Sequence, residues 1–126
     1  SDVYKRQAKY MLKNKEGTII FSGATASMRG SSGFSAFASA KFGLRALAQS
    51  MARELGPKGI HVAHTVIDGA IDHPWIKENF PDIYKLKKKD GILKPDEIAQ
   101  VYLDLHHQKR SVWTHEVDLR PYMEKF

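Results

Sequence analysis

The chain has 126 residues, which is enough for one domain with its own core and too few for two. A composition of 42% hydrophobic and 27% charged residues is typical of a folded protein and excludes a disordered one. The lack of cysteine excludes disulfides and thiolate metal sites, and no apolar run approaches the roughly 20 residues of a membrane helix. We therefore expect a cytoplasmic protein without a membrane partner.

The net charge of +6 arises largely from two groups of lysines: Lys5, Lys9, Lys13, Lys15 and Lys85, Lys87, Lys88, Lys89. Such groups suit an anionic partner, either a nucleotide phosphate or a nucleic acid. A solvated surface explains them more simply, and we expect no nucleic-acid partner.

The N-terminus is polar and basic, without the apolar stretch of a secretory signal. It also lacks an initiator Met, and residues 7–13 have the pattern of the end of a helix. We expect a truncated chain with a non-native leader in residues 1–6.

Residues 18–21 are a short apolar run rich in β-formers, which indicates a buried parallel strand. A loop rich in Ser and Gly follows over residues 22–33. Residues 34–55 carry a helical pattern, and its apolar stripe is Leu44, Leu47, Ala48, Met51 and Leu55. Residues 56–59 contain Gly and Pro and end this helix, while Arg45 lies on another face, where we expect solvent.

Residues 60–67 form a second apolar strand, which the Asp68-Gly69 pair ends. Residues 72–90 are basic and predict a mobile, partly helical stretch. A further helix starts at residues 94–96, and residues 111–119 form a third strand. Because helices and strands alternate, we predict an α/β fold with about three parallel strands joined by crossover helices.

The most informative spacing is that of Phe37 and Lys41, four residues apart at the start of the long helix. Residues at i and i+4 share a helix face, so an ammonium at position 41 would lower the pKa of a phenol at position 37. Position 37 is Phe, which has no ionisable proton. The pattern is that of an acid–base pair without its acid.

Three pieces in this order resemble the short-chain dehydrogenase/reductase family: GTIIFSGATAS, FSAFASAKFGLRALAQSMARELGPKGIHV and the DGAID turn. The resemblance covers roughly residues 7–120 and implies the C-terminal half of a Rossmann-like, doubly wound parallel sheet. The chain would be one partial domain over residues 1–126. Within it, residues 17–70 would be the active-site half, 72–94 the substrate lid, and 95–122 the last helix and strand.

The resemblance also implies roles for single residues. Phe37 stands at the position of the family's proton-transferring Tyr, and Ala24 at that of the Ser that polarises the substrate carbonyl. Lys41 keeps the Lys that binds the ribose and lowers the pKa of the Tyr. Ser22 or Ser27 would replace the missing Ser if the loop has another register.

By the same resemblance the cofactor is NAD or NADP and the substrate a small carbonyl or alcohol. Lys41 and the turn after the second strand, with Gly69, Ala70, Ile71 and His73, would contact the cofactor. None of the nine glycines forms the Gly-rich loop that holds a dinucleotide pyrophosphate. The cofactor pocket is therefore incomplete here, and we expect no appreciable dinucleotide binding by these residues alone.

The six histidines lack the spacing of metal ligands, and we expect no metal. In the resembled family the helix at residues 34–55 lies at a subunit interface, which implies a homodimer. Two functional hypotheses stay open. One is an oxidoreductase with a degenerate site that is inactive as this fragment, and the other is a non-catalytic binding or scaffold protein.

Overall fold

The computed structural model describes the backbone of residues 2–126 and the side chains from residue 6 onward. Of the leader expected in residues 1–6, residue 1 and the side chains of residues 2–5 lie outside the described residues. The longer elements in chain order are α1 Asp2–Asn14, β1 Gly17–Ala24, α2 Ser35–Leu55, β2 Ile60–Ile67, α5 Pro95–His107 and β3 Glu116–Leu119. The shorter elements are η1 Thr25–Ser27, η2 Gly56–Lys58, α3 Pro74–Asn79, α4 Pro81–Tyr84, η3 Lys85–Lys89 and η4 Arg110–Val112.

The sheet has three parallel strands in the order β1-β2-β3, which confirms the predicted fold class. Gly17 of β1 pairs with Ile60 at one end and Ala24 with Ile67 at the other, so β1 and β2 end at the same edge. The third strand is shorter than residues 111–119, because it starts at Glu116. Residue Thr114 is instead held by side chains: the ring of His61 bonds its carbonyl at 2.7 Å.

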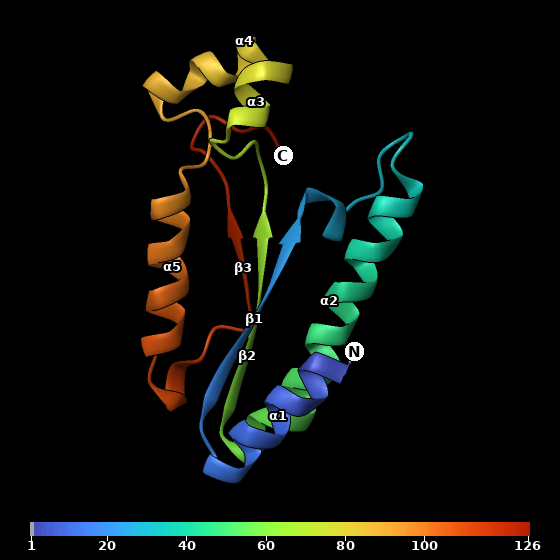
Figure 1. Cartoon of the computed structure of the whole chain (residues 1–126), viewed down its shortest axis with the longest axis vertical. Coiled ribbons are helices and arrows are strands. Elements are labelled where there is room, and N and C mark those ends of the chain that lie inside the picture. Colours follow the sequence, from blue (N-terminus) through green and yellow to red (C-terminus); the bar gives the residue numbers. More distant parts are fainter. Residues whose placement is uncertain (1) are drawn as a thin grey trace.

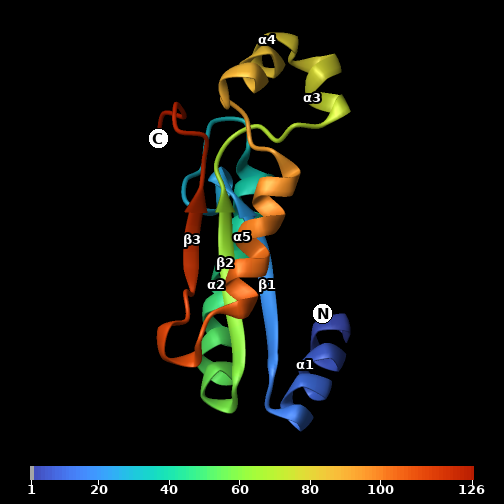
Figure 2. The same ribbon diagram turned by 90° about the vertical axis from the view of Figure 1, so that its left-hand side faces the viewer.

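Helices cover both faces of the sheet. Figures 1 and 2 show α1 and α2 on one side of the strands and α5 on the other. The core lies between the sheet and α2, and its buried members are Phe21, Ala48, Leu55, Ile60 and Val62. Leu47 was wrongly placed in the core-facing stripe, since it is 41% exposed.

The two crossovers differ in hand. The strands follow one another in a single direction across the sheet, while α2 and α5 lie on opposite faces. One crossover is therefore left-handed, against the strong general preference for right-handed βαβ units. The segment between β2 and α5 contains three short helical turns before α5 begins, and this excursion lets the chain reach the other face.

Helix α2 ends at Leu55, as residues 56–59 predicted, and the chain turns toward β2 at Gly59. Gly56 is still helical, with φ −55° and ψ −50°, because the chain continues into η2. Gly59 has φ +92°, and a Cβ there would meet the backbone carbonyl oxygen of Lys15. Only glycine fits this position without strain.

The segment 72–94 lies beyond the carboxyl ends of β2 and β3, where it forms α3, α4 and η3 (Figure 1). Two of its ion pairs neutralise lysines internally, Lys87 with Asp72 at 2.9 Å and Lys94 with Asp90 at 2.6 Å. Among the described residues, no helix is both long and apolar enough to cross a bilayer.

Candidate functional site

Helix α2 places Phe37 and Lys41 on one face, as the spacing predicted. The Nζ atom of Lys41 lies 5.8 Å from the centroid of the Phe37 ring, within the range of a cation–π contact. The same ammonium donates a hydrogen bond to the carbonyl oxygen of Ser22, near the end of β1, at 3.2 Å. Because the ring is 49% exposed and carries no hydroxyl, this pair offers a charge and an apolar surface but no proton.

The loop after β1 holds the three residues considered for the serine role. Ala24 ends β1 and has only a methyl group. Ser27 is fully buried, and its Oγ accepts a hydrogen bond from the backbone N–H of Ala24 at 3.0 Å. The Oγ of Ser22 lies 2.5 Å from the hydroxyl of Tyr102 on α5. Both serine hydroxyls therefore have internal partners.

The turn after β2 is held by backbone hydrogen bonds. Gly69 has φ +146°, and its Cα approaches Pro121 so closely that a Cβ would lie 3.0 Å from the ring Cδ. The carbonyl of Ala70 accepts a bond from Leu93 N at 2.8 Å, and Ile71 forms a parallel bridge with Leu93. The backbone at Gly69 thus has a conformation that favours glycine.

His73 lies farther along this turn and caps a helix. Its Nδ1 accepts the backbone N–H of Trp75 at 3.1 Å, in the first turn of α3. In this arrangement His73 orders the start of the segment 72–94. A cofactor contact by His73, Ala70 or Ile71 stays a prediction.

Asp68 is a central site residue whose role sequence reasoning missed. Its side chain is buried, with the residue only 4% exposed, and it joins the ends of three strands. Thr25, just after β1, donates its hydroxyl to one carboxylate oxygen at 2.5 Å, and Arg120, just after β3, donates to the other at 3.2 Å. The sequence signal that could have identified Asp68 is its position, a charged residue directly between an apolar strand and a glycine.

Burial by itself would raise the pKa of the Asp68 carboxyl. The hydrogen bonds from Thr25 and Arg120, with the charges of Arg120 and Arg29, outweigh burial, so the net pKa is lowered. Asp68 is therefore a carboxylate at neutral pH and a poor proton donor.

A second charged cluster lies between the sheet and α2. Arg45 makes two hydrogen bonds to the carboxylate of Glu116 on β3, at 2.8 and 2.9 Å. The expectation that Arg45 faces solvent was wrong, because the residue opposite it in the fold is acidic. The hydrogen bond from Arg45 is the main cause that lowers the pKa of Glu116, with His64 adding to it against burial.

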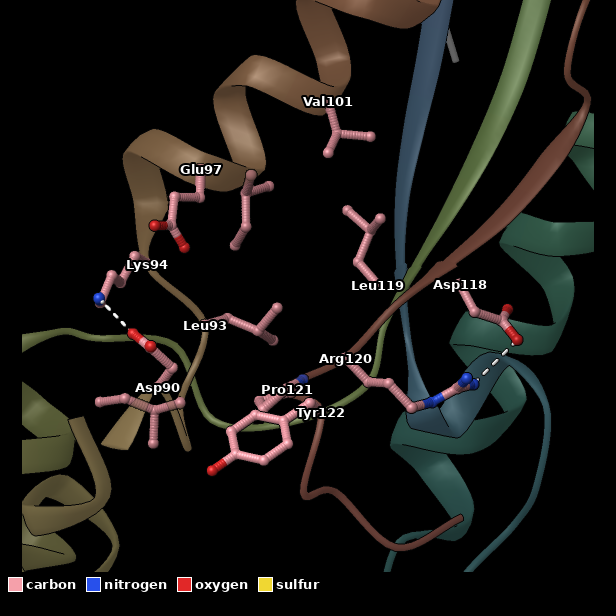
Figure 3. A pocket seen from close by; sticks show the side chains of 12 residues that line it. Asp90, Leu93, Lys94, Glu97, Val101, Asp118, Leu119, Arg120, Pro121 and Tyr122 are labelled. Carbon is pink, nitrogen blue, oxygen red and sulfur yellow. Dashed lines mark hydrogen bonds and ion pairs between the residues drawn. The ribbon is translucent and has the colours of Figure 1, made fainter. Parts of the chain in front are cut away.

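A pocket of about 350 Å³ lies between the start of α5, the end of β3 and the C-terminal residues (Figure 3). Leu93, Leu119 and Val101 form its apolar wall, and Tyr122 lies at its edge (Figure 3). None of its lining residues is among the predicted site residues. The predicted site is thus the carboxyl edge of β1 and β2 with the start of α2, apart from this pocket.

A sequence model described as short chain dehydrogenase matches residues 2–82. The chain belongs to this family. The predicted membership is confirmed, and with it the Rossmann-like character of the half-sheet. No curated protein gives a significant match.

Solved structures extend the likeness beyond residue 82. A short-chain dehydrogenase from Rhodopseudomonas palustris is 48% identical, with a TM-score of 0.70, over 94% of this chain and 44% of that one. A serine dehydrogenase complexed with NADP+ is 14% identical, with a TM-score of 0.77, over 98% of this chain and 52% of that one. A 4-hydroxyisoleucine dehydrogenase complexed with NADH is 20% identical, with a TM-score of 0.74, over 94% of this chain and 52% of that one.

The last two likenesses show the fold alone, since their identities are low. The chain spans about half the length of the solved structures that it matches. Those two relatives were solved with NADP+ and with NADH, respectively.

Proposed function

We propose that the chain supplies the substrate-side half of an NAD(P)-dependent oxidoreductase, which moves a hydride between a nicotinamide and a small carbonyl or alcohol. The observation that carries this proposal is the place of Lys41, one helical turn after position 37 and at the carboxyl edge of β1, in a member of this family. Ligands of open α/β sheets bind at this edge.

The residues present fit one end of the cofactor. Lys41 uses one of its three N–H donors on Ser22, so two remain for ribose hydroxyls. Gly69 has no side chain, and the ring of Pro121 takes the space of a Cβ there, so this fit rests on Lys41. No Gly-rich phosphate loop occurs in the sequence, so these 126 residues fit the nicotinamide riboside end and not the pyrophosphate. When bound, the cofactor supplies the hydride.

The acid–base part of the site is weakened. Phe37 holds no proton, and Ala24 has no hydroxyl to polarise a substrate oxygen. Loss of one positioned proton donor costs about two to four orders of magnitude in rate. Lys41 keeps a positive charge that stabilises negative charge on the substrate oxygen, whose proton would come from water. We propose that carbonyl reduction is slow by this route.

Phe37→Tyr tests the proposal in the whole protein that contains this chain. The new phenol would lie beside Lys41, so we expect carbonyl reduction with NADPH to rise about 10²-fold or more. The test measures NADPH oxidation over a panel of small ketones and aldehydes, and Phe42→Tyr on the same helix serves as the matched control.

Tight NADPH binding without turnover in either the parent or the Phe37→Tyr protein would reject the enzyme proposal. That outcome would indicate a non-catalytic binding or scaffold protein of the same family. Ala24 and Phe37, which lack the groups for catalysis, agree with this alternative.

We further propose that the protein acts in the cytoplasm on a small-molecule substrate, with residues 72–94 as its lid, and that it forms a homodimer through α2. The position of α3, α4 and η3 beyond the strand ends supports the lid. Exposed apolar side chains on α2, among them Phe42 and Leu47, support the dimer.

A further inference from the structure

His64 is fully buried on β2, with its ring between the sheet and α2. Its Nδ1 lies 3.1 Å from Oε2 of Glu116. Its Nε2 has no hydrogen-bond partner among the described residues. A buried polar atom left unpaired costs about 1–3 kcal/mol, so the surroundings of Nε2 require an explanation.

Ser27 lies beside this unpaired nitrogen. Both side chains press against Gly23: a Cβ built on Gly23 would lie 2.2 Å from His64 Nε2 and 2.6 Å from Ser27 Oγ. The Ser27 oxygen already accepts the N–H of Ala24, and its own hydrogen is free to be donated. The nearby acceptor that lacks a donor is Nε2 of His64.

The partner of Nδ1 determines which nitrogen carries the proton in a neutral His64 ring. The carboxylate of Glu116 is already paired with Arg45 through two hydrogen bonds. An imidazolium at His64 would be a second cation on a carboxylate that Arg45 already binds, and its ring would be fully buried. In the neutral ring, Nδ1–H donates to Glu116 and Nε2 accepts.

We propose that the Ser27 hydroxyl donates to Nε2 of a neutral His64, so that Arg45, Glu116, His64 and Ser27 form one chain of hydrogen bonds ending on the backbone of Ala24. In the structure the two side chains lie together at Gly23 without a hydrogen bond between them. The chain runs from α2 through β3 and β2 to the loop after β1. Ser27 and His64 are therefore positioning residues, which fix the backbone at Ala24.

The relevance to catalysis rests on the proposed function, because Ala24 stands where the family has its carbonyl-polarising Ser. The hydrogen bonds themselves do not depend on that function. They would hold the loop beside Lys41 in one conformation whether or not the protein turns over a substrate.

The test is NMR of the ¹⁵N-labelled protein at neutral pH, with His64 assigned by the loss of its signals in His64→Gln. We expect a protonated Nδ1 and an unprotonated Nε2 whose shift reports an accepted hydrogen bond. Ser27→Ala should move the Nε2 signal toward that of a free lone pair. It should also speed amide exchange at Ala24 about fivefold or more.

Ser22→Ala is the matched control, since it removes a hydroxyl bonded to Tyr102 and should change neither signal. Spectra of the unmodified protein that show an imidazolium, or a neutral ring protonated at Nε2, would overturn the proposal. An unchanged His64 signal in a folded Ser27→Ala protein would overturn it as well. Neither measurement involves cofactor or turnover, so failure here is distinct from failure of the proposed function.

Discussion

At the scale of single residues, three positions are defined by groups that their side chains lack. Phe37 has no hydroxyl, so the ring beside Lys41 has no ionisable proton. Gly23 and Gly69 lack a Cβ, and each lets another element approach closely. Asp68 acts through a group that is present. Its buried carboxylate binds Thr25 after β1 and Arg120 after β3, and so holds these two loops together.

Gly23→Ala should destabilise the fold by about 1–3 kcal/mol, because the methyl group would overlap the His64 ring and the Ser27 oxygen. Gly43→Ala is the matched control. Gly43 lies within α2 with nothing near its Cβ position, so alanine there should stabilise by about 0.5–1 kcal/mol. Denaturant unfolding at low protein concentration measures both. Equal effects at the two positions would show that the packing around Gly23 is looser than described.

Asp68→Asn should reduce the free energy of unfolding by about 1–3 kcal/mol at pH 7, because the bonds from Thr25 and Arg120 lose the charge that they bind. The pKa of Asp68 is lower in the folded state than in the unfolded one. Its stabilisation is therefore present above the unfolded pKa of about 3.9 and is lost as the pH falls through the folded pKa.

Unfolding curves between pH 2 and 7 check this sign. The Asp68→Asn variant should lose less stability over the acid range than the unmodified protein. Asp82→Asn, at a carboxylate whose side chain is 96% exposed, is the control and should lose about as much stability as the unmodified protein. A variant with the same acid slope as the unmodified protein would show that Asp68 titrates alike in both states.

At the scale of elements, α2 serves two surfaces. One buries Ala48 and Leu55 against the sheet, and the other exposes Phe42 and Leu47. Exposed apolar side chains gathered on one helix are typical of an interface. The short turns α3, α4 and η3 contribute little to the core, since the buried cluster is drawn from the strands and from α2.

Leu47→Glu should weaken the proposed homodimer, because a carboxylate would be buried in its apolar contact. We expect the dissociation constant to rise about tenfold or more in sedimentation velocity experiments. Leu103→Glu on α5 is the control, since Leu103 is exposed on the other face of the sheet. A dimer that survives Leu47→Glu and dissociates with Leu103→Glu would place the interface on α5 instead.

At the scale of the whole molecule, the chain forms a half-sheet with helices on both faces, and β1 and β3 are its edges. The residues that we propose to bind the cofactor lie at one end of that sheet. Without a phosphate loop they would hold only part of a dinucleotide.

The 126-residue chain should therefore show no NADH or NADPH binding in calorimetric titration up to about millimolar cofactor, equivalent to less than about 4 kcal/mol. Low-micromolar affinity would contradict this expectation and would mean that a pyrophosphate site exists without glycines. A longer relative of the same family is the positive control.

The sequence by itself determined the parallel α/β order, β2 with its bounds, and the contact of Lys41 with position 37, because these follow from periodicity and from spacing along one helix or strand. The tertiary structure alone decided which faces the helices cover, and hence the left-handed crossover. It also decided the partners of Arg45 and Asp68, because Glu116 and Arg120 lie 71 and 52 residues away in sequence. Contacts between distant residues depend on how the strands align, and no local pattern records that alignment.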